Sequence, residues 1–338
     1  MIDFRSDTFT KPGHGMLQAM YTAETGDDVF GEDPSVNKLE AMMADYFGKE
    51  AALYCPSGTM SNQIGINVHT QPGDEVICSH LSHVYLYEGG GIAATSGAQV
   101  HPIHGIRGMI TAGQVVAAIQ PDDIHRANTS LVCLENTSNR GGGCCYTWQD
   151  ILSIRNVCTQ HNLGLHLDGA RLFNAIVATG QDPKAYGQVF DSISVCLNKG
   201  MGCPMGSVLM GSKDYIKAAR RVRKRLGGGL RQAGYMAATG IYAMENNIQR
   251  LTEDHLHAKK IAGTLAEKSF VGEIYPVETN ILIFEVKGHL NPQQFAEYLK
   301  MEGILVQPIS DSQVRMVLHL DIIPEMVERT CKVIEGLK

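Results

Sequence analysis

The 338-residue sequence has little charge and no long apolar segment. Charged residues make up 19%, and the net charge is −6, from 29 basic and 35 acidic residues. Nothing in this balance favours binding to nucleic acid or to an anionic membrane. The longest stretch without a charged residue, 51–73, carries Ser, Thr, Asn and Gln, which excludes a membrane-spanning helix. Asp3, Arg5 and Asp7 interrupt the apolar run that a secretory signal peptide needs.

Paired cysteines are also missing. The nine cysteines are an odd number, and none of them forms a Cys-x-x-Cys pair. The adjacent Cys144 and Cys145 are poorly placed to bond to each other. This usage predicts reduced thiols, a cytoplasmic location and no metal site.

Glycine, in contrast, is abundant. The chain has 36 glycines, about 11% against a typical ~7%. They follow no repeat, but three triplets occur, at 89–91, 141–143 and 227–229. Such triplets form loops, and they also let backbone approach a ligand closely.

The first two thirds of the chain alternate between short apolar runs and amphipathic stretches. The apolar runs predict strands at 51–54, 75–78, 130–135, 163–168 and 192–197. Helical spacing of apolar residues predicts helices such as Ser35 to Phe47 and Trp148 to His161. This alternation is typical of an α/β fold, in which helices cover both faces of a mostly parallel sheet.

The last third predicts a second, smaller α+β unit. One long helix, Gln232 to His257, is expected to lead into it. The pattern then predicts a strand at 280–286, a helix at 292–302, strands at 304–307 and 314–319, and a final helix from Pro324. We therefore expect one domain over residues 1–245 and another over 246–338.

Three groups of polar residues follow predicted strands, where functional side chains collect in α/β folds. Ser57-Gly58-Thr59 begins a helix and suits either a phosphate or simple capping. Asp168 ends a strand three residues before Arg171, so the two form either a ligand site or a structural pair. Lys199 ends another strand before a glycine-rich turn, far from other charges, so it is either a solvated surface lysine or a Schiff-base nucleophile. Together they are the parts that pyridoxal 5′-phosphate needs.

With these residues in view, the chain resembles the low-specificity L-threonine and L-allo-threonine aldolases. These are fold-type I pyridoxal-phosphate (PLP) enzymes with an aspartate-aminotransferase-like large domain and a small C-terminal domain. The resemblance covers essentially the whole length and rests on blocks at 2–12, 26–34, 48–52, 56–59, 134–137, 166–171 and 226–232.

The resemblance implies a role for each matching residue. Lys199 is the Schiff-base lysine, Asp168 holds the pyridinium nitrogen, and His83 stacks on the cofactor ring. Ser57, Gly58 and Thr59 bind the phosphate, helped by Arg231 from a neighbouring subunit. The substrate carboxylate is held by Ser6, Arg171 and Arg315, and Arg171 also belongs to the cofactor-binding residues. His125 lies near the β-hydroxyl, Lys224 is a further active-site lysine, and either His83 or His125 serves as the base.

The activity that the resemblance implies is retro-aldol cleavage of L-threonine or L-allo-threonine to glycine and an aldehyde. The partner is a small amino acid, with no nucleic acid or membrane, and active sites are shared within a homodimer or homotetramer. β-Elimination or racemisation on the same cofactor is the nearest alternative. A non-catalytic ligand-binding descendant is disfavoured by Lys199, Asp168, Arg171 and Arg315. A nucleotide-binding protein would need a glycine motif that is missing here.

The chain also departs from the family pattern. Ser138 stands where histidine is usual, Asn198 where serine is common, and Phe30 where tyrosine is common. The stretch 140–146 is unusual as well. These changes spare the cofactor residues but leave side-chain preference and threo/erythro selectivity open.

Overall fold

The large lobe is built on a seven-stranded sheet. We describe the protein from a computed structural model, which covers residues 1–337. The strand order is β2-β8-β7-β6-β5-β3-β4, and every strand except β8 runs in the same direction. Its strands are β2 (Ala51–Cys55), β3 (Asp74–Ser79), β4 (Gln99–Ile103), β5 (Asn128–Glu135), β6 (Gly164–Gly169), β7 (Ser192–Cys196) and β8 (Ser207–Gly211). The expected α/β fold with a mostly parallel sheet is confirmed.

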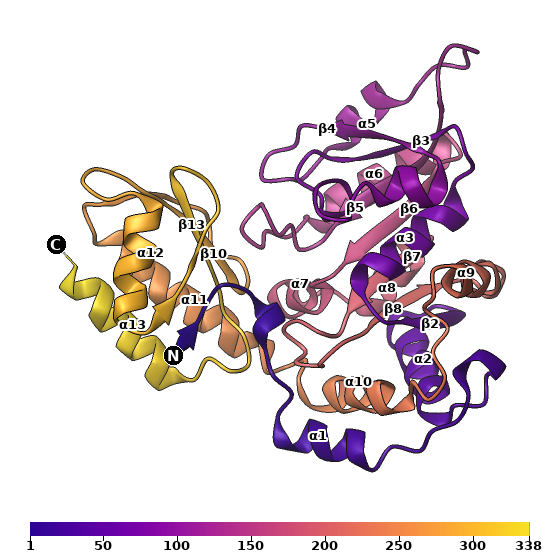
Figure 1. The fold of residues 1–338 in the computed structure, drawn as a ribbon. Coiled ribbons are helices and arrows are strands. Elements are labelled where there is room, and N and C mark those ends of the chain that lie inside the picture. Colours follow the sequence, from indigo (N-terminus) through magenta and orange to yellow (C-terminus); the bar gives the residue numbers. More distant parts are fainter. Residues whose placement is uncertain (338) are drawn as a thin grey trace.

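Helices cover both faces of this sheet (Figure 1). On one face α2, α6, α7 and α8 pack over the main apolar core, and on the other face α3 and α9 pack over a separate apolar cluster. The helices of this lobe are α1 (His14–Tyr21), α2 (Pro34–Phe47), α3 (Gly58–His69), α4 (His83–Leu86), α5 (Ala112–Ala118), α6 (Trp148–Gln160), α7 (Leu172–Thr179), α8 (Pro183–Val189), α9 (Lys213–Arg225) and α10 (Gly234–Asn246).

The small lobe has its own sheet and its own core. An antiparallel sheet of order β12-β13-β10-β9 packs against three helices. These elements are α11 (Leu251–Ala266), β9 (Val271–Ile274), β10 (Ile281–Val286), α12 (Pro292–Met301), β12 (Gln307–Pro308), β13 (Gln313–Val317) and α13 (Pro324–Gly336). The α+β character expected for this part of the chain is confirmed.

The first residues of the chain belong to this small lobe. Strand β1 (Ile2–Asp3) pairs in parallel with β11 (Ile304–Leu305), and Phe4 is fully buried in the small core. The N-terminal segment then crosses toward the large lobe (Figure 1). It therefore connects the two lobes beside the α10–α11 turn.

Two sequence expectations are wrong. The single helix expected from Gln232 to His257 is two helices, α10 and α11, separated by a turn. Asparagine is a poor helix former, and Asn247 turns its side-chain amide to the carbonyl of Met201 at 2.8 Å. The turn lets α10 pack on α1 and α2 while α11 packs on α7 and α13. The strand expected at 304–307 is likewise divided between β11 and β12, which lie in different sheets.

All nine cysteines are free thiols, as expected, and eight of them are buried. None of the helices within residues 1–337 has the length and apolar character that a bilayer crossing requires.

Candidate active site

The turn from β2 into α3 forms the first part of the site. Ser57 caps α3, and its hydroxyl accepts a hydrogen bond from the Met60 N–H at 3.2 Å. Gly58 has no room for a side chain, because a Cβ there would lie 2.5 Å from Cys196 Sγ. Thr59 joins Ser57 and Gly58 in lining a cavity of about 170 Å³. The free N–H groups and the positive end of α3 make this turn suitable for a phosphate.

Asp168 lies at the other side of the same cavity, near the end of β6. It is 2% exposed, and alternation along β6 directs it toward the α3 face. Its two carboxylate oxygens accept hydrogen bonds from the Ala170 N–H at 3.1 Å and the Asn62 amide at 3.0 Å. The side chain is therefore fixed with a buried negative charge facing the cavity.

Two further buried carboxylates, those of Glu135 and Glu88, lie next to Asp168. Glu135 is its direct neighbour across β5 and β6, and Glu88 shares the Asn62 amide with it at 2.9 Å. Burial and the charge of Asp168 raise the pKa of Glu135 to about 7. Glu135 also accepts backbone N–H bonds from His83 at 2.7 Å and from Asn139 at 2.8 Å, so it joins the two segments that flank the cavity.

His83 begins α4 and lies at the junction of two cavities. Its Nδ1 is 2.9 Å from a carboxylate oxygen of Glu88. Burial would lower the pKa of His83, but the hydrogen bond to Glu88 and the charges of Asp168 and Glu88 raise it overall. Atoms of His83, Glu88 and Asp168 lie within 4.8 Å of one another, a spacing that a metal could use. The hydrogen bonds that connect these groups, through Asn62 in part, account for that spacing.

Lys199 follows β7 and lines both cavities, as His83 does. Its Nζ lies 3.6 Å from Cys196 Sγ. The structure therefore brings Lys199, Asp168 and the α3 turn together, as the sequence predicts.

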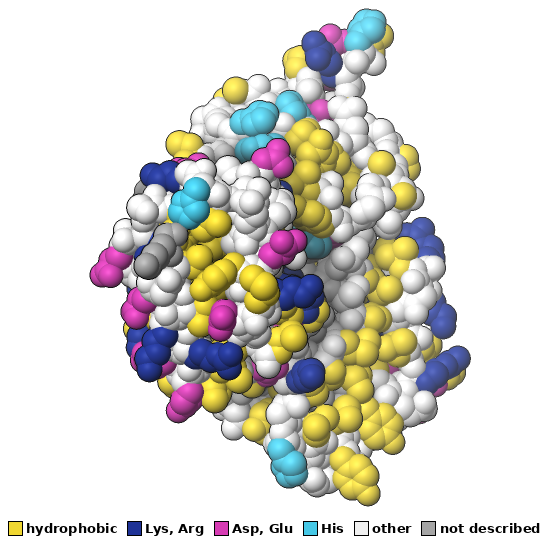
Figure 2. Space-filling model, turned by 60° about the vertical axis from the view of Figure 1, so that its left-hand side comes forward, with side chains coloured by type: hydrophobic (Ala, Val, Ile, Leu, Met, Phe, Trp, Pro, Cys, Tyr) yellow, Lys and Arg dark blue, Asp and Glu magenta, His cyan; other side chains and the backbone are white. Residues whose placement is uncertain are grey.

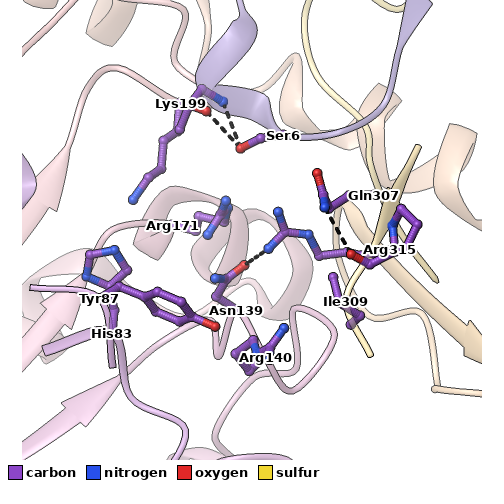
Figure 3. A pocket seen from close by; sticks show the side chains of 12 residues that line it. Ser6, His83, Tyr87, Asn139, Arg140, Arg171, Lys199, Gln307, Ile309 and Arg315 are labelled. Carbon is purple, nitrogen blue, oxygen red and sulfur yellow. Dashed lines mark hydrogen bonds between the residues drawn. The ribbon is translucent and has the colours of Figure 1, made fainter. Parts of the chain in front are cut away.

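The second cavity, of about 480 Å³, lies between the two lobes (Figure 3). Arg171 and Ser6 face it from the large lobe and the N-terminal segment, and Arg315 faces it from β13 of the small lobe. The surface view shows Lys and Arg side chains at the hollow between the lobes (Figure 2). An amino-acid carboxylate fits this positive environment.

Arg171 does not pair with Asp168, which corrects the structural alternative considered from the sequence. Its Nε and Nη2 each lie 2.7 Å from a carboxylate oxygen of Asp7, and both side chains are at most 5% exposed. Burial alone would raise the pKa of Asp7, but the charge and hydrogen bonds of Arg171 lower it to about 2. Nη1 is the guanidinium nitrogen left for a ligand.

Arg315 is held by Asn139 and the Arg5 carbonyl. Its Nη1 donates to Asn139 Oδ1 at 3.0 Å and its Nη2 to the Arg5 carbonyl at 3.1 Å. Burial, together with the charge of Arg171, lowers the pKa of Arg315 to about 10. Its guanidinium is thus oriented toward the cavity before any ligand binds.

Three residues expected in the site lie elsewhere in the single chain. His125 is on the loop between α5 and β5, which projects from the large lobe (Figure 1); its side chain is 81% exposed and pairs with Asp123. Arg231 is 56% exposed and pairs with Asp27 at 2.8 Å. Lys224 lines a separate surface hollow with Phe30. Within one chain, none of the three lines either cavity.

Several residues that line the cavities or bond to their lining were not identified from the sequence. They are Asn62, Tyr87, Glu88, Glu135, Asn139, Arg140, Gln307 and Ile309. Glu135 had a usable signal, because it ends a predicted strand next to the one that carries Asp168. Gln307 and Ile309 had none, because only the contact between the lobes brings them to the cavity.

The fold is that of the fold-type I PLP enzymes. Solved structures that share this fold include threonine aldolase of Leishmania major (TM-score 0.86, 21% identity, 99% of each chain) and SPT with PLP (TM-score 0.75, 14% identity, 99% of this chain and 86% of the other). By sequence, residues 3–289 match the beta-eliminating lyase family. The low specificity L-threonine aldolase of Escherichia coli K12 is 43% identical over 328 residues, 97% of this chain and 96% of the relative. The chain belongs to the beta-eliminating lyases and, among them, to the low-specificity L-threonine aldolase family.

Proposed function

We propose that this protein cleaves L-threonine or L-allo-threonine, and other β-hydroxy-α-amino acids, to glycine and an aldehyde with the help of PLP. The observation that carries the proposal is the pair of adjoining cavities. One has the phosphate turn and Asp168, the other has Arg171 and Arg315, and Lys199 lines both. Family membership and this arrangement point to the same reaction.

The residues of the smaller cavity fit PLP. The α3 turn with Ser57, Gly58 and Thr59 would hold its phosphate, and Lys199 would bond to its aldehyde carbon. Asp168 would hold the proton on the pyridine nitrogen, and that cation would offset the buried negative charge of Asp168. When bound, PLP supplies the electron sink for the pair released from the Cα–Cβ bond.

The residues of the larger cavity would bind and orient the amino acid. Ser6, Arg171 and Arg315 would hold its carboxylate, which fixes the direction of the Cα–Cβ bond. A base must then take the proton of the β-hydroxyl as that bond breaks. His83 is the histidine that lines the cavity, and His125 would serve only if a neighbouring subunit delivered it.

We further propose a homodimer or homotetramer with shared sites. Arg231, Lys224 and His125 lie outside the cavities of their own chain, so the roles that the resemblance implies for them require a neighbouring subunit. Large apolar side chains are exposed on the surface, with Phe30, beside Lys224, at 72% and Tyr21 at 82%. We also propose two domains, 1–245 and 246–338. The separate cores of the two lobes support this division, although the large core takes in Ile248 and Leu251 and the small core takes in Ile2 and Phe4. The free thiols support a reducing compartment such as the cytoplasm.

The first prediction tests the reaction itself. The purified protein loaded with PLP converts L-allo-threonine to equal amounts of glycine and acetaldehyde, with kcat in the usual range of roughly 1–10³ s⁻¹. Both products are measured in one assay, with the D-isomers as controls. No acetaldehyde at high enzyme concentration would refute the proposal.

The family description favours one second candidate, β-elimination. That reaction would release pyruvate and ammonia from serine, whereas aldol cleavage releases an aldehyde and glycine. We expect the aldehyde to dominate, because Arg171 and Arg315 would orient the Cα–Cβ bond through the substrate carboxylate, and a relative that is 43% identical is a threonine aldolase. Elimination would be favoured if serine gave mainly pyruvate and L-allo-threonine did not react.

The second prediction identifies the base. If His83 takes the hydroxyl proton, only its neutral form is active, so kcat/KM rises with pH through its pKa. Because Glu88 helps raise that pKa, Glu88→Gln moves this rise to lower pH. His83→Asn lowers kcat by about 10²- to 10⁴-fold. Profiles of kcat/KM against pH measure both effects. An unchanged profile in Glu88→Gln, together with a large loss in His125→Asn, assigns the base to His125 instead.

A further inference from the structure

Arg140 lines the substrate cavity and has no carboxylate partner. It is half-buried, and its guanidinium carbon lies 5.9 Å from the centre of the Tyr87 ring. Among residues 1–337, no acidic side chain pairs with it, whereas Arg171 and the nearby Arg107 pair with Asp7 and Glu278 at 2.7 Å. In Figure 3, Arg140 lies with Tyr87 and Asn139 on the cavity wall that faces Gln307 and Ile309. An unpaired guanidinium in such a cavity is suited to an anionic ligand.

The loop that carries Arg140 is rigidly built. Arg107 Nε donates to the Gly141 carbonyl at 2.8 Å, and Thr279 Oγ1 donates to the Gly143 carbonyl at 2.7 Å. Gly142 and Gly143 have φ values of +79° and +70°, a region that favours glycine. A Cβ on Gly141 would clash with the Arg107 carbonyl, and one on Gly143 with Thr279 Oγ1. The glycine triplet at 141–143 therefore folds a fixed turn that holds Arg140 against the cavity.

The cavity carries more positive charge than the single α-carboxylate of a simple amino acid can neutralise. Its cationic side chains are Arg140, Arg171, Lys199 and Arg315. Asp7 neutralises Arg171, and Lys199 would be taken up by the cofactor. The α-carboxylate of the substrate would meet Arg315 with Arg171. Arg140 remains as one positive charge without a partner, beside the space left for the substrate side chain.

We propose that Arg140 binds an anionic group on the substrate side chain, so that the preferred substrates are β-hydroxy-α-amino acids with an acidic side chain. The simplest of these is 3-hydroxyaspartate. This inference rests on the proposed aldol cleavage. The Cα–Cβ bond breaks, the β-hydroxyl loses its proton to the base and becomes the aldehyde of glyoxylate, and Cα gains a proton to give glycine. The atoms balance without an oxidant or reductant.

The test compares two substrates in three proteins. Glycine formation from L-3-hydroxyaspartate (threo and erythro) and from L-allo-threonine is measured in the wild type, in Arg140→Ala and in Arg329→Ala. Arg329, on the outer surface of α13, is the matched control. We expect Arg140→Ala to lower kcat/KM for 3-hydroxyaspartate by about 10- to 100-fold, the loss of a charge-assisted hydrogen bond. The value for L-allo-threonine stays within about threefold, and Arg329→Ala changes neither.

A second measurement covers the case in which Arg140→Ala fails to fold. In the wild type, L-aspartate should inhibit L-allo-threonine cleavage more strongly than L-2-aminobutyrate does, because these are the analogues of the two substrates without the hydroxyl. Equal inhibition, or an equal loss on both substrates in Arg140→Ala, would overturn the role of Arg140. L-allo-threonine cleavage without 3-hydroxyaspartate cleavage would overturn it too. Glycine from neither substrate would instead refute the proposed function.

Discussion

Lys199→Ala lowers kcat for L-allo-threonine cleavage by about 10³-fold or more, which is the largest effect we expect on activity. Lys199 lines both cavities, so its amine is the group that can join the cofactor to the site where the substrate binds. Acetaldehyde release measures the loss. The matched control is Lys213→Ala, which removes an exposed lysine at the start of α9 and leaves the rate unchanged.

A spectrum separates this role from a merely structural one. The wild type mixed with PLP should gain absorbance near the visible edge from the bond between Lys199 and the cofactor. Lys199→Ala should lose that band while keeping its thermal unfolding transition. An unchanged band in the variant would show that another amine holds the cofactor.

Asp7→Asn is the substitution that we expect to destabilise the fold most. It leaves the buried guanidinium of Arg171 without a counter-charge, which costs about 3–5 kcal/mol in the free energy of unfolding. Urea unfolding measures the change. Glu328→Gln, which removes one partner of an exposed ion pair with Lys260, serves as the control and should have little effect.

Two observations check the reason for this loss. Asp7→Leu combined with Arg171→Met removes both charges and should be less destabilised than Asp7→Asn alone. The pKa of Asp7 is lowered in the folded protein, so the stability it adds is present above its unfolded pKa of about 3.9 and is lost as the pH falls toward 2. A double variant that is no more stable than Asp7→Asn would show that packing, and not charge, explains the cost.

The sequence correctly placed residues at the cavities where the pattern that indicates them lies in the neighbouring residues. Asp168 and Lys199 each follow a regular apolar strand, and parallel neighbours must bring such ends to one edge of the sheet. The turn at Ser57 was recognisable for the same reason. The break between α10 and α11 was missed because apolar spacing continues through it, whereas Asn247 in the turn bonds to the carbonyl of Met201, which is far away in the sequence.

Contacts between segments that are far apart in the sequence could not be predicted from such local patterns. Arg171 had a near candidate in Asp168, yet its partner is Asp7, which the small lobe holds in place through β1. Arg140 reaches the cavity because Arg107 and Thr279 fix its loop from two other parts of the chain. His125, Arg231 and Lys224 lie outside their own cavities, so their assignment to the site still depends on the resemblance and on an assembly of subunits.

The path of the N-terminal segment has a consequence for biosynthesis. Strand β1 leaves the ribosome first, but its partner β11 is made near the end of translation. The Val317 N–H that bonds to the Phe4 carbonyl is made later still. Asp7 and Ser6 therefore gain their final positions only after the small lobe has formed. A nascent chain that has already folded its large sheet still lacks the final positions of Ser6, Arg315 and the Asp7–Arg171 pair, which would hold the substrate carboxylate. The ability to bind substrate should therefore be the last property that the protein acquires.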